Sequence, residues 1–308
     1  MRSDQIFKGI LLAFAAFAAY SCSDAAVKYI AGRMSPFESA FFGACFGAAA
    51  LPFLKKKADR WSDIFATTNR PLWIVRFVAK GLGCIGSVTA FTHLSMAEAF
   101  CLIFLLPSFV TIMSVIFLKE IVGLKRWGAV ALGFIGVLIV LRPGFRELSI
   151  GHAGAVLAGI SGAVSIVVFR AVGPSEKNLS QYGSGLLGIL VICGLAMIPS
   201  YTPPAPQDWL LLAAYGLLGA VGNVLIMYAA FYTPAAILAP TQYSQMIWAI
   251  LFGYLIFGDA VDAPMLAGIV LIVGSGLLTL SRERTKGVPL PPPMTPDGQA
   301  DAMVKPER

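Results

Sequence analysis

Two ionisable residues, Asp24 and Lys28, lie four positions apart inside the first apolar run of the chain. Residues at this spacing share one face of a helix, so the two charges could pair. The pair could then hold and release a proton, or it could open when another charged group competes for either partner. The alternative role is structural, with the pair stabilising its own helix and Lys28 extending its ammonium group toward water. The spacing leaves both hypotheses open.

A second charged pair, Arg76 and Lys80, repeats this spacing in a later apolar run. Two cations on one helix face repel each other unless they share an anion. They could therefore bind the carboxylate or phosphate group of a ligand. The alternative is extension toward water, which suits Arg76 because it lies near the end of its run, close to Arg70. Lys80 lies deeper, where a charge is a candidate for function.

A stripe of polar and aromatic residues follows Pro240, with Gln242, Gln245 and Trp248 spaced three positions apart. Pro240 removes a backbone donor and can bend a helix at this point. The stripe could hydrogen-bond and stack a flat ligand, or it could form hydrogen bonds between helices. Weaker candidates for the lining of such a site are Tyr20, Ser161, Ser165, Asn223 and Tyr228.

The sequence contains no common catalytic or nucleotide-binding motif. It has no His-Glu-x-x-His pair, no Gly-rich phosphate loop and no Gly-x-Ser-x-Gly turn. His93 and His152 are the only histidines, and the five cysteines lie in apolar runs without the spacing of a zinc site. We therefore interpret the cysteines as small buried hydrophobic residues. We expect no metal, no cofactor, no enzymatic activity and no use of ATP.

Composition places these residues in a membrane. Of the 308 residues, 57% are hydrophobic and 13% are charged, whereas soluble domains have about 45–50% apolar and about 25% charged residues. A helix needs about 20 apolar residues to cross a bilayer. Ten runs reach or approach this length, which predicts an all-α membrane protein with ten transmembrane helices. The runs are roughly 6–30, 37–54, 72–92, 98–118, 125–141, 151–169, 181–198, 209–231, 236–257 and 263–280.

Basic residues predict the orientation of these helices. Lys and Arg gather in alternate loops, among them residues 55–60 and 282–286. Loops of this kind stay on the cytoplasmic side, so we expect both termini in the cytoplasm. The net charge of +7 comes from these clusters, and we expect it to face anionic lipid rather than nucleic acid. Residues 285–308 are rich in Pro and polar groups and predict a disordered tail.

The two halves of the chain resemble each other. Each half contains two glycines eight positions apart, Gly128 with Gly136 and Gly268 with Gly276. The ten predicted helices divide into two five-helix units, residues 1–144 and residues 145–284. Because five is odd, the second unit enters the membrane from the opposite side. Such inverted repeats are a signature of secondary transporters, whose substrate binds near the midplane; duplication for stability alone is the alternative.

The repeat also aligns two loop acids, Glu120 and Asp259. We expect each to pair with a nearby basic residue or to cap the following helix. Glu98, at the start of the fourth run, is expected to complement the dipole of its helix.

Longer stretches resemble a known family. Residues 96–144, which begin MAEAFCLIFLLPSF, and residues 235–283, which begin AAILAPTQYSQMIW, resemble the two EamA-type repeats of the drug/metabolite transporter superfamily. The resemblance covers roughly residues 6–284. It implies ten helices, a central cavity and transport of small metabolites such as amino acids, cofactors or vitamins across a bacterial inner membrane.

Two local features refine this resemblance. Residues 23–42, SDAAVKYIAGRMSPFESAFF, resemble the S-adenosylmethionine uptake branch of the family. Many members carry an Arg in the second helix, where this chain reads AFFGACFG around Gly43. The role of that Arg is therefore missing here or is taken by Arg76 or Lys80.

These patterns predict a secondary transporter that moves a small polar or amphipathic metabolite by alternating access. The expected partners are this substrate and membrane lipid, and the glycines leave a homodimer open. The alternative is a membrane scaffold or receptor whose centre is filled with apolar side chains. The expected substrate-binding residues are Lys80, Gln242, Gln245, Trp248, Tyr20, Tyr228, Ser161 and Arg76, and the expected gating or proton-coupling residues are Asp24 and Lys28.

Overall fold

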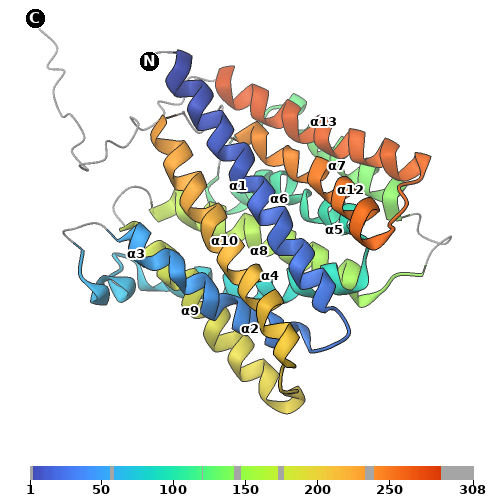
Figure 1. Cartoon of the computed structure of the whole chain (residues 1–308). Coiled ribbons are helices and arrows are strands. Elements are labelled where there is room, and N and C mark those ends of the chain that lie inside the picture. The colour runs from blue at the N-terminus through green and yellow to red at the C-terminus, as the bar shows by residue number, and fades with distance from the viewer. Residues whose placement is uncertain are drawn as a thin grey trace, which may run out of the picture.

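The computed structural model describes residues 3–55, 59–119, 121–141, 147–172, 177–232 and 239–285. Within these ranges the chain is helical, apart from loops and an isolated β-bridge between Ala31 and Met34. Short 3₁₀ segments η2 (Trp61–Phe65) and η5 (Ala239–Tyr243) precede α4 and α12. The helices are α1 (Ser3–Ile30), α2 (Pro36–Gly47), α3 (Leu51–Leu54), α4 (Arg70–His93), α5 (Met96–Ile103), α6 (Leu106–Phe117), α7 (Leu124–Leu141), α8 (Ile150–Val172), α9 (Asn178–Met197), α10 (Pro206–Tyr232), α12 (Ser244–Phe257) and α13 (Ala263–Thr285), arranged as in Figure 1.

The helices have the length and surface of membrane-spanning segments. In the described part of the chain, seven candidate spans are long and apolar enough to cross a bilayer, and Trp127–Leu141 and Ala263–Leu278 are shorter apolar helices. Large apolar side chains remain exposed on the outside of the bundle, such as Leu210 at 76% and Tyr254 at 69%. A bilayer can cover such side chains, whereas soluble monomeric proteins rarely expose apolar patches of this extent. The all-helical class predicted from composition is confirmed.

Two of the predicted helices are interrupted near a proline. The run predicted at 98–118 is divided between α5 and α6. Pro107 lies in the first turn of α6, where it cannot donate a hydrogen bond to the last carbonyl of α5. The described part of the run predicted at 236–257 begins with η5, which contains Pro240, and becomes α-helical only in α12.

Three helix pairs make the most extensive contacts, namely α1 with α10, α4 with α8, and α7 with α13 (Figure 1). Glycines allow two of these pairs to approach closely. A Cβ atom added to Gly154 of α8 would lie 2.7 Å from the carbonyl oxygen of Gly86 in α4. A Cβ atom added to Gly268 of α13 would lie 2.7 Å from the carbonyl oxygen of Gly136 in α7. Small residues have this role at many membrane helix crossings.

The centre of the bundle is built around α5. Every residue from Met96 to Leu102 is buried. The ring of Phe100 lies 5.1 Å from that of Phe91 in α4 and 5.6 Å from that of Phe104, measured between centroids. These ring contacts fix α5 against α4, one of the helices that line the cavity described below.

Several helix ends meet at one end of the bundle, which we call the Lys28 end. Here α1, α4 and α12 finish, and α5, α8 and α13 begin, joined by hydrogen bonds described below. In Figure 1, α1 begins and α13 finishes toward the opposite end. The predicted tail after Thr285 and the loop acid Glu120 lie outside the described residues.

Candidate functional site

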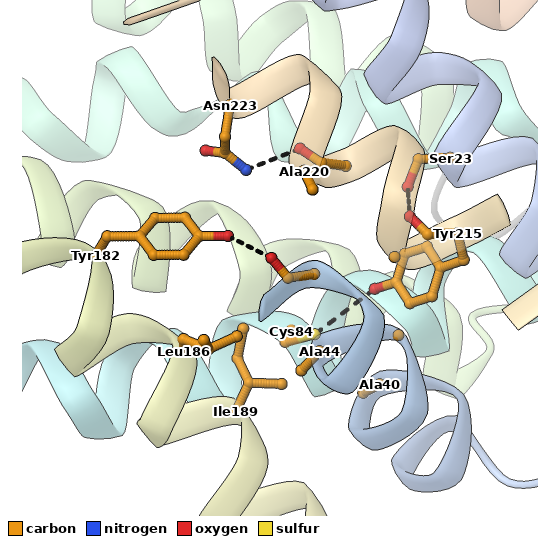
Figure 2. Close-up of a pocket in the computed structure, with 14 residues that line it drawn as sticks. Ser23, Ala40, Ala44, Cys84, Tyr182, Leu186, Ile189, Tyr215, Ala220 and Asn223 are labelled. Atoms are coloured by element: carbon orange, nitrogen blue, oxygen red, sulfur yellow. Dashed lines mark hydrogen bonds between the residues drawn. The ribbon is translucent and has the colours of Figure 1, made fainter. Parts of the chain in front are cut away.

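A cavity of about 170 Å³ lies among α1, α2, α4, α9 and α10 (Figure 2). A single water molecule has a share of liquid volume of about 30 Å³, so the cavity is larger than a packing defect. Its lining residues are Ser23, Ala40, Gly43, Ala44, Gly47, Cys84, Tyr182, Leu186, Ile189, Tyr215, Gly216, Gly219, Ala220 and Asn223.

Small residues on α2 and α10 create this space. Gly43 and Gly47 of α2 face Gly216 of α10, and a Cβ atom on Gly216 would overlap the Gly43 carbonyl oxygen. A Cβ atom on Gly43 would overlap the ring of Tyr215. The Tyr215 ring therefore lies directly against the α2 backbone, and its hydroxyl group reaches across to Cys84 of α4. This is where the sequence resemblance would have placed an Arg on the second helix.

Five side chains that can form hydrogen bonds line the cavity (Figure 2). The Tyr215 hydroxyl lies 3.7 Å from the Cys84 thiol, and Ser23 donates to the Tyr215 carbonyl oxygen at 2.6 Å. Tyr182 donates to the Gly47 carbonyl oxygen at 3.1 Å. The Asn223 amide donates to a backbone carbonyl of its own helix at 2.9 Å, and its oxygen accepts no hydrogen bond from the described residues. The cavity can therefore offer a ligand both donors and acceptors.

Two half-buried charged groups lie next to lining residues of the cavity, on two different helices. Asp24 of α1 follows the lining residue Ser23, and its carboxylate lies within electrostatic range of Cys84 and Tyr215. Lys80 of α4 lies one turn before Cys84 and is also within electrostatic range of that thiol. Among the described residues, neither Asp24 nor Lys80 has a hydrogen bond or an ion pair.

The stem of Lys80 crosses a glycine of the neighbouring helix. A Cβ atom added to Gly185 of α9 would lie 3.1 Å from Lys80 Cγ. The lack of a side chain at Gly185 therefore leaves room for the Lys80 side chain between α4 and α9. The lining residues Tyr182 and Leu186 flank this glycine in the α9 sequence.

Lys28 does not pair with Asp24, so the expected pair within one helix is wrong. Instead, Lys28 Nζ lies 3.0 Å from Asp259 Oδ2 and donates to the Leu94 carbonyl oxygen at 2.8 Å. The same Asp259 oxygen accepts from the Met96 backbone N–H at 3.2 Å. Asp259 thus pairs with a basic residue, as predicted, and also satisfies a free donor at the start of α5. The cluster joins α1, the α4–α5 junction and the α12–α13 loop.

Two more polar contacts tie helix ends at the Lys28 end. Arg33, in the loop after α1, donates to Asp208 in the first turn of α10 at 2.9 Å. Glu98 of α5 lies 3.2 Å from His152 Nε2 of α8. The expectation for Glu98 named only the helix dipole and missed this partner.

A separate ion pair lies at the opposite end of the bundle, outside the spanning segments. Lys177, which precedes α9, contacts Asp63 of η2 at 2.6 Å and Asp59 at 3.5 Å. The hydrogen bond from Lys177 holds the pKa of the Asp63 carboxyl below its usual value. Ile64 packs beside this pair over Gly183 of α9. These contacts fix η2 against the start of α9.

The predicted stripe of the ninth run does not line this cavity. Gln242 lies in η5, Gln245 is buried in α12, and Trp248 stacks on Phe252 with ring centroids 5.7 Å apart. The three residues therefore do not share one regular α-helix, because η5 ends and α12 begins between Gln242 and Gln245.

The weaker candidates also lie away from the cavity lining, apart from Asn223. Tyr20 packs against Gly222 of α10, and Tyr228 is 44% exposed. Arg76, predicted from its pairing with Lys80, also lies outside the lining; it is half-buried and has other interactions.

The remaining weaker candidates are two buried serines of α8, Ser161 and Ser165. Ser161 packs against Gly83 of α4. Ser165 donates to the Ser161 carbonyl oxygen at 3.0 Å. Both serines are thus accounted for by packing and by a hydrogen bond within their own helix.

Four polar or thiol residues of the cavity lining were missed at the sequence level, namely Ser23, Cys84, Tyr182 and Tyr215. The cysteine was interpreted as a small hydrophobic residue, and the two tyrosines carry no spacing that marks them. The clearest available signal was the pair of small-residue stretches on α2 and α10, which leave room for an aromatic ring between helices.

Comparison with known proteins agrees with this architecture. Residues 7–142 and, separately, residues 148–281 match the EamA-like transporter family. The chain belongs to the EamA-like transporter family. The resemblance drawn from residues 96–144 and 235–283 is therefore confirmed, and the chain is a multi-pass bacterial membrane transporter of small metabolites.

Individual relatives cover nearly the whole EamA-like chain. The pseudopaline exporter CntI of Pseudomonas aeruginosa is 25% identical, over 92% of this chain and 98% of its own length. The S-adenosylmethionine uptake transporter of Rickettsia bellii is 27% identical, over 86% of this chain and 90% of its own length. A solved crystal structure with 16% identity matches with a TM-score of 0.59, over 93% of this chain and 100% of that chain, which shows a shared fold.

Proposed function

We propose that this EamA-family chain is a secondary transporter of a small zwitterionic metabolite, an amino acid or a molecule that carries an amino-acid group. The observation that supports this most directly is the pair of charged residues beside the cavity. Asp24 and Lys80 approach it from different helices, and neither makes an ion pair with a described residue. Charges at such depth are costly, so a bound partner of opposite charge is the physical reason to keep them.

The charges match the two ends of a zwitterion. A ligand ammonium group would face Asp24, and a ligand carboxylate would face Lys80, because charge-assisted hydrogen bonds are about twice as strong as neutral ones. Asn223 and Tyr215 supply neutral hydrogen-bonding groups between them. The cavity of about 170 Å³ is smaller than the roughly 300–1,000 Å³ of sites for drug-sized ligands, which favours a small molecule or the amino-acid part of a larger one.

The names of the relatives are compatible with this substrate class. One relative is named as an S-adenosylmethionine uptake transporter, and S-adenosylmethionine carries the amino and carboxylate groups of methionine. Another is named as an exporter, so the family supports either direction of transport.

We further propose ten spans arranged as two inverted five-helix units, residues 1–144 and 145–284. The two separate family matches support the division. The packing supports it too, because α1 with α10 and α4 with α8 are equivalent pairs under such a repeat, and both are extensive. Movement of one unit against the other would expose the cavity to each side of the membrane in turn.

In this scheme the Lys28 end faces the outside and both termini face the cytoplasm of a bacterial inner membrane. The Lys28–Asp259 pair then acts as part of the outer gate, since it joins α1 of the first unit to a loop of the second. Opening the outer side would require this pair to separate or to move as a body. An ion gradient or the substrate gradient would drive the cycle.

The test is thermal stabilisation of the purified full-length chain by amino acids, S-adenosylmethionine, nucleosides, flavins and quaternary amines. A ligand at a hundredfold excess over its Kd adds about 2.7 kcal/mol of stability. We expect zwitterions to raise Tm, and Lys80→Ala and Asp24→Asn to abolish the rise. The exposed residues Lys125 and Glu147 provide matched controls as Lys125→Ala and Glu147→Gln. Stabilisation that survives both cavity variants would contradict the proposed site.

A further inference from the structure

Tyr182 connects the two halves of the chain at the wall of the cavity. It lines the cavity from α9, and its hydroxyl donates to the Gly47 carbonyl oxygen of α2 at 3.1 Å. Figure 2 shows the Tyr182 side chain extended from α9 toward α2, with Asn223 beside it. Because α2 belongs to the first five-helix unit and α9 to the second, this hydrogen bond must change if the two units move apart.

Tyr182 and Gly47 lie at the end of the cavity that is away from the Lys28 end. Helix α2 begins at the Lys28 end and finishes at Gly47, and α9 runs in the opposite direction. A contact near the other end of this helix pair agrees with that order, since a Cβ atom on Gly194 of α9 would lie 3.1 Å from the Phe41 ring of α2. Among the lining residues of α2 and α9, Gly47 and Tyr182 are therefore the farthest from the Lys28 end.

Two further contacts hold the start of α9 against the first unit. Lys177, which precedes α9, lies 2.6 Å from Asp63 of η2. Ile64 of η2 packs over Gly183, the residue that follows Tyr182. The units are thus joined beside Tyr182, just as Lys28 and its partners join them at the Lys28 end.

We propose that Tyr182 is the inner gate of the cavity, a side chain whose ring separates the cavity from the end opposite Lys28 and whose hydroxyl holds α9 to α2 while that end is closed. A rigid aromatic ring is large enough to obstruct a narrow passage. A single neutral hydrogen bond contributes little net stability, so it can break and form again in every cycle.

This inference deepens the proposed function and rests on it, because a cavity needs a gate at each end only if it opens to the two sides in turn. The Lys28–Asp259 pair then acts at one end and Tyr182 at the other. Tyr182 could instead only pack α9 against α2, in which case its removal would lower stability without changing access to the cavity from one side.

The experiment measures how fast a small membrane-impermeant methanethiosulfonate labels Cys84, which lines the cavity. Whole cells present one face of the membrane to the reagent and inside-out vesicles present the other. Peptide mass spectrometry reads the labelling of Cys84 separately from that of the other cysteines. Lys125→Cys identifies the face, because exposed Lys125 lies at the start of α7, at the end of the bundle opposite Lys28.

From the face that carries Lys125, we expect faster labelling of Cys84 in two variants. Tyr182→Ala removes the ring and should raise the rate about tenfold or more, since it exposes a passage that an apolar ring had filled. Tyr182→Phe keeps the ring and should raise the rate about threefold, the factor expected for the loss of one neutral hydrogen bond. Neither variant should change the rate from the other face. Tyr201→Ala is the matched control, because Tyr201 is exposed and outside the lining.

Equal labelling rates in wild type, Tyr182→Phe and Tyr182→Ala would overturn the inference, and so would a rise of the same size from both faces. If thermal unfolding shows that Tyr182→Ala does not fold, the more conservative Tyr182→Phe decides the question. The labelling needs no substrate. Failure of every panel compound to raise Tm would therefore count against the proposed function, separately from the result for the gate.

Discussion

Lys28 and Asp259 lie 231 positions apart in the sequence, yet Lys28 Nζ and Asp259 Oδ2 are 3.0 Å apart in the fold. Their side chains are only 12% and 20% exposed. The pair is also hydrogen-bonded to the backbone of the α4–α5 junction through Leu94 and Met96. One contact therefore ties the first helix to the loop that precedes the last helix.

Replacing Asp259 by Asn should weaken the Lys28 end. The amide keeps a hydrogen bond but loses the charge, so we expect a loss of about 1.5–3 kcal/mol, the range for hydrogen bonds to charged groups. If the pair belongs to the outer gate, a membrane-impermeant thiol reagent added from outside should label Cys84 faster in this variant. The measurement is the labelling rate in whole cells.

The charge reversal Lys28→Asp with Asp259→Lys is the control for Asp259→Asn. It restores opposite charges and should recover part of the lost stability. Equal labelling rates in wild type and Asp259→Asn would show that the pair does not control access from that side.

Close packing of α2 and α10 predicts an unusual effect of a single methyl group. In Gly216→Ala the new methyl would overlap the Gly43 carbonyl oxygen, a backbone atom that cannot turn aside. We expect a loss of about 1–3 kcal/mol, as for other overpacked sites, together with weaker ligand binding because the cavity narrows. Thermal unfolding of the purified protein measures the first effect.

The matched control for Gly216→Ala is Gly128→Ala in α7. No neighbouring atom lies within 4 Å of a Cβ atom at Gly128, so this variant should have an unchanged or slightly raised Tm. Equal Tm values for the two variants would argue against the described α2–α10 contact.

The Asp63–Lys177 pair predicts a pH effect of definite sign. Because Lys177 lowers the Asp63 pKa in the folded protein, the pair stabilises the fold above the unfolded pKa of about 3.9. This contribution is lost as pH falls through the lower folded pKa. Asp63→Asn should therefore reduce Tm slightly at neutral pH and leave it unchanged at strongly acidic pH.

High salt provides the control for the Asp63→Asn prediction, because it screens exposed charges. At 1 M salt the difference in Tm between wild type and Asp63→Asn should shrink. A difference that persists at acidic pH and in high salt would mean that packing, rather than charge, holds η2 on α9.

The predicted stripe on the ninth run now leads to a different expectation. Gln245 is buried in α12 and does not line the cavity, so Gln245→Ala should lower Tm while leaving ligand affinity unchanged. Gln242→Ala should also leave affinity unchanged. Isothermal titration with the stabilising ligand measures the affinity, and thermal unfolding measures Tm. A large loss of ligand affinity without a loss of stability would indicate that the stripe contacts the ligand.

The helices were predictable because a long apolar run is a local property of the sequence. The break between α5 and α6 was less visible, since the run 98–118 stays apolar across it and only Pro107 marks it. The predicted orientation depends on basic loops and stays a prediction.

The site was harder to predict because its contacts join distant positions. The i,i+4 rule offered Asp24 as the partner of Lys28, but it could not weigh Asp259, which arrives from a distant loop. Asp24 and Lys80 were proposed because charges are rare in apolar runs. A charge of this kind can be recognised in the sequence without knowing which residue it contacts. Tyr215 and Cys84 could not be found in this way, since an isolated Tyr or Cys is common in any membrane helix.

Flux into proteoliposomes tests the central claim most directly. Full-length protein is reconstituted, loaded with the stabilising zwitterion and assayed for counterflow of the same radiolabelled compound. We predict robust counterflow by wild type and by Lys125→Ala, and a loss of about tenfold or more in Lys80→Ala and Asp24→Asn, equivalent to about 1.4 kcal/mol or more. Counterflow that is equal in all four proteins would contradict a substrate site between Asp24 and Lys80.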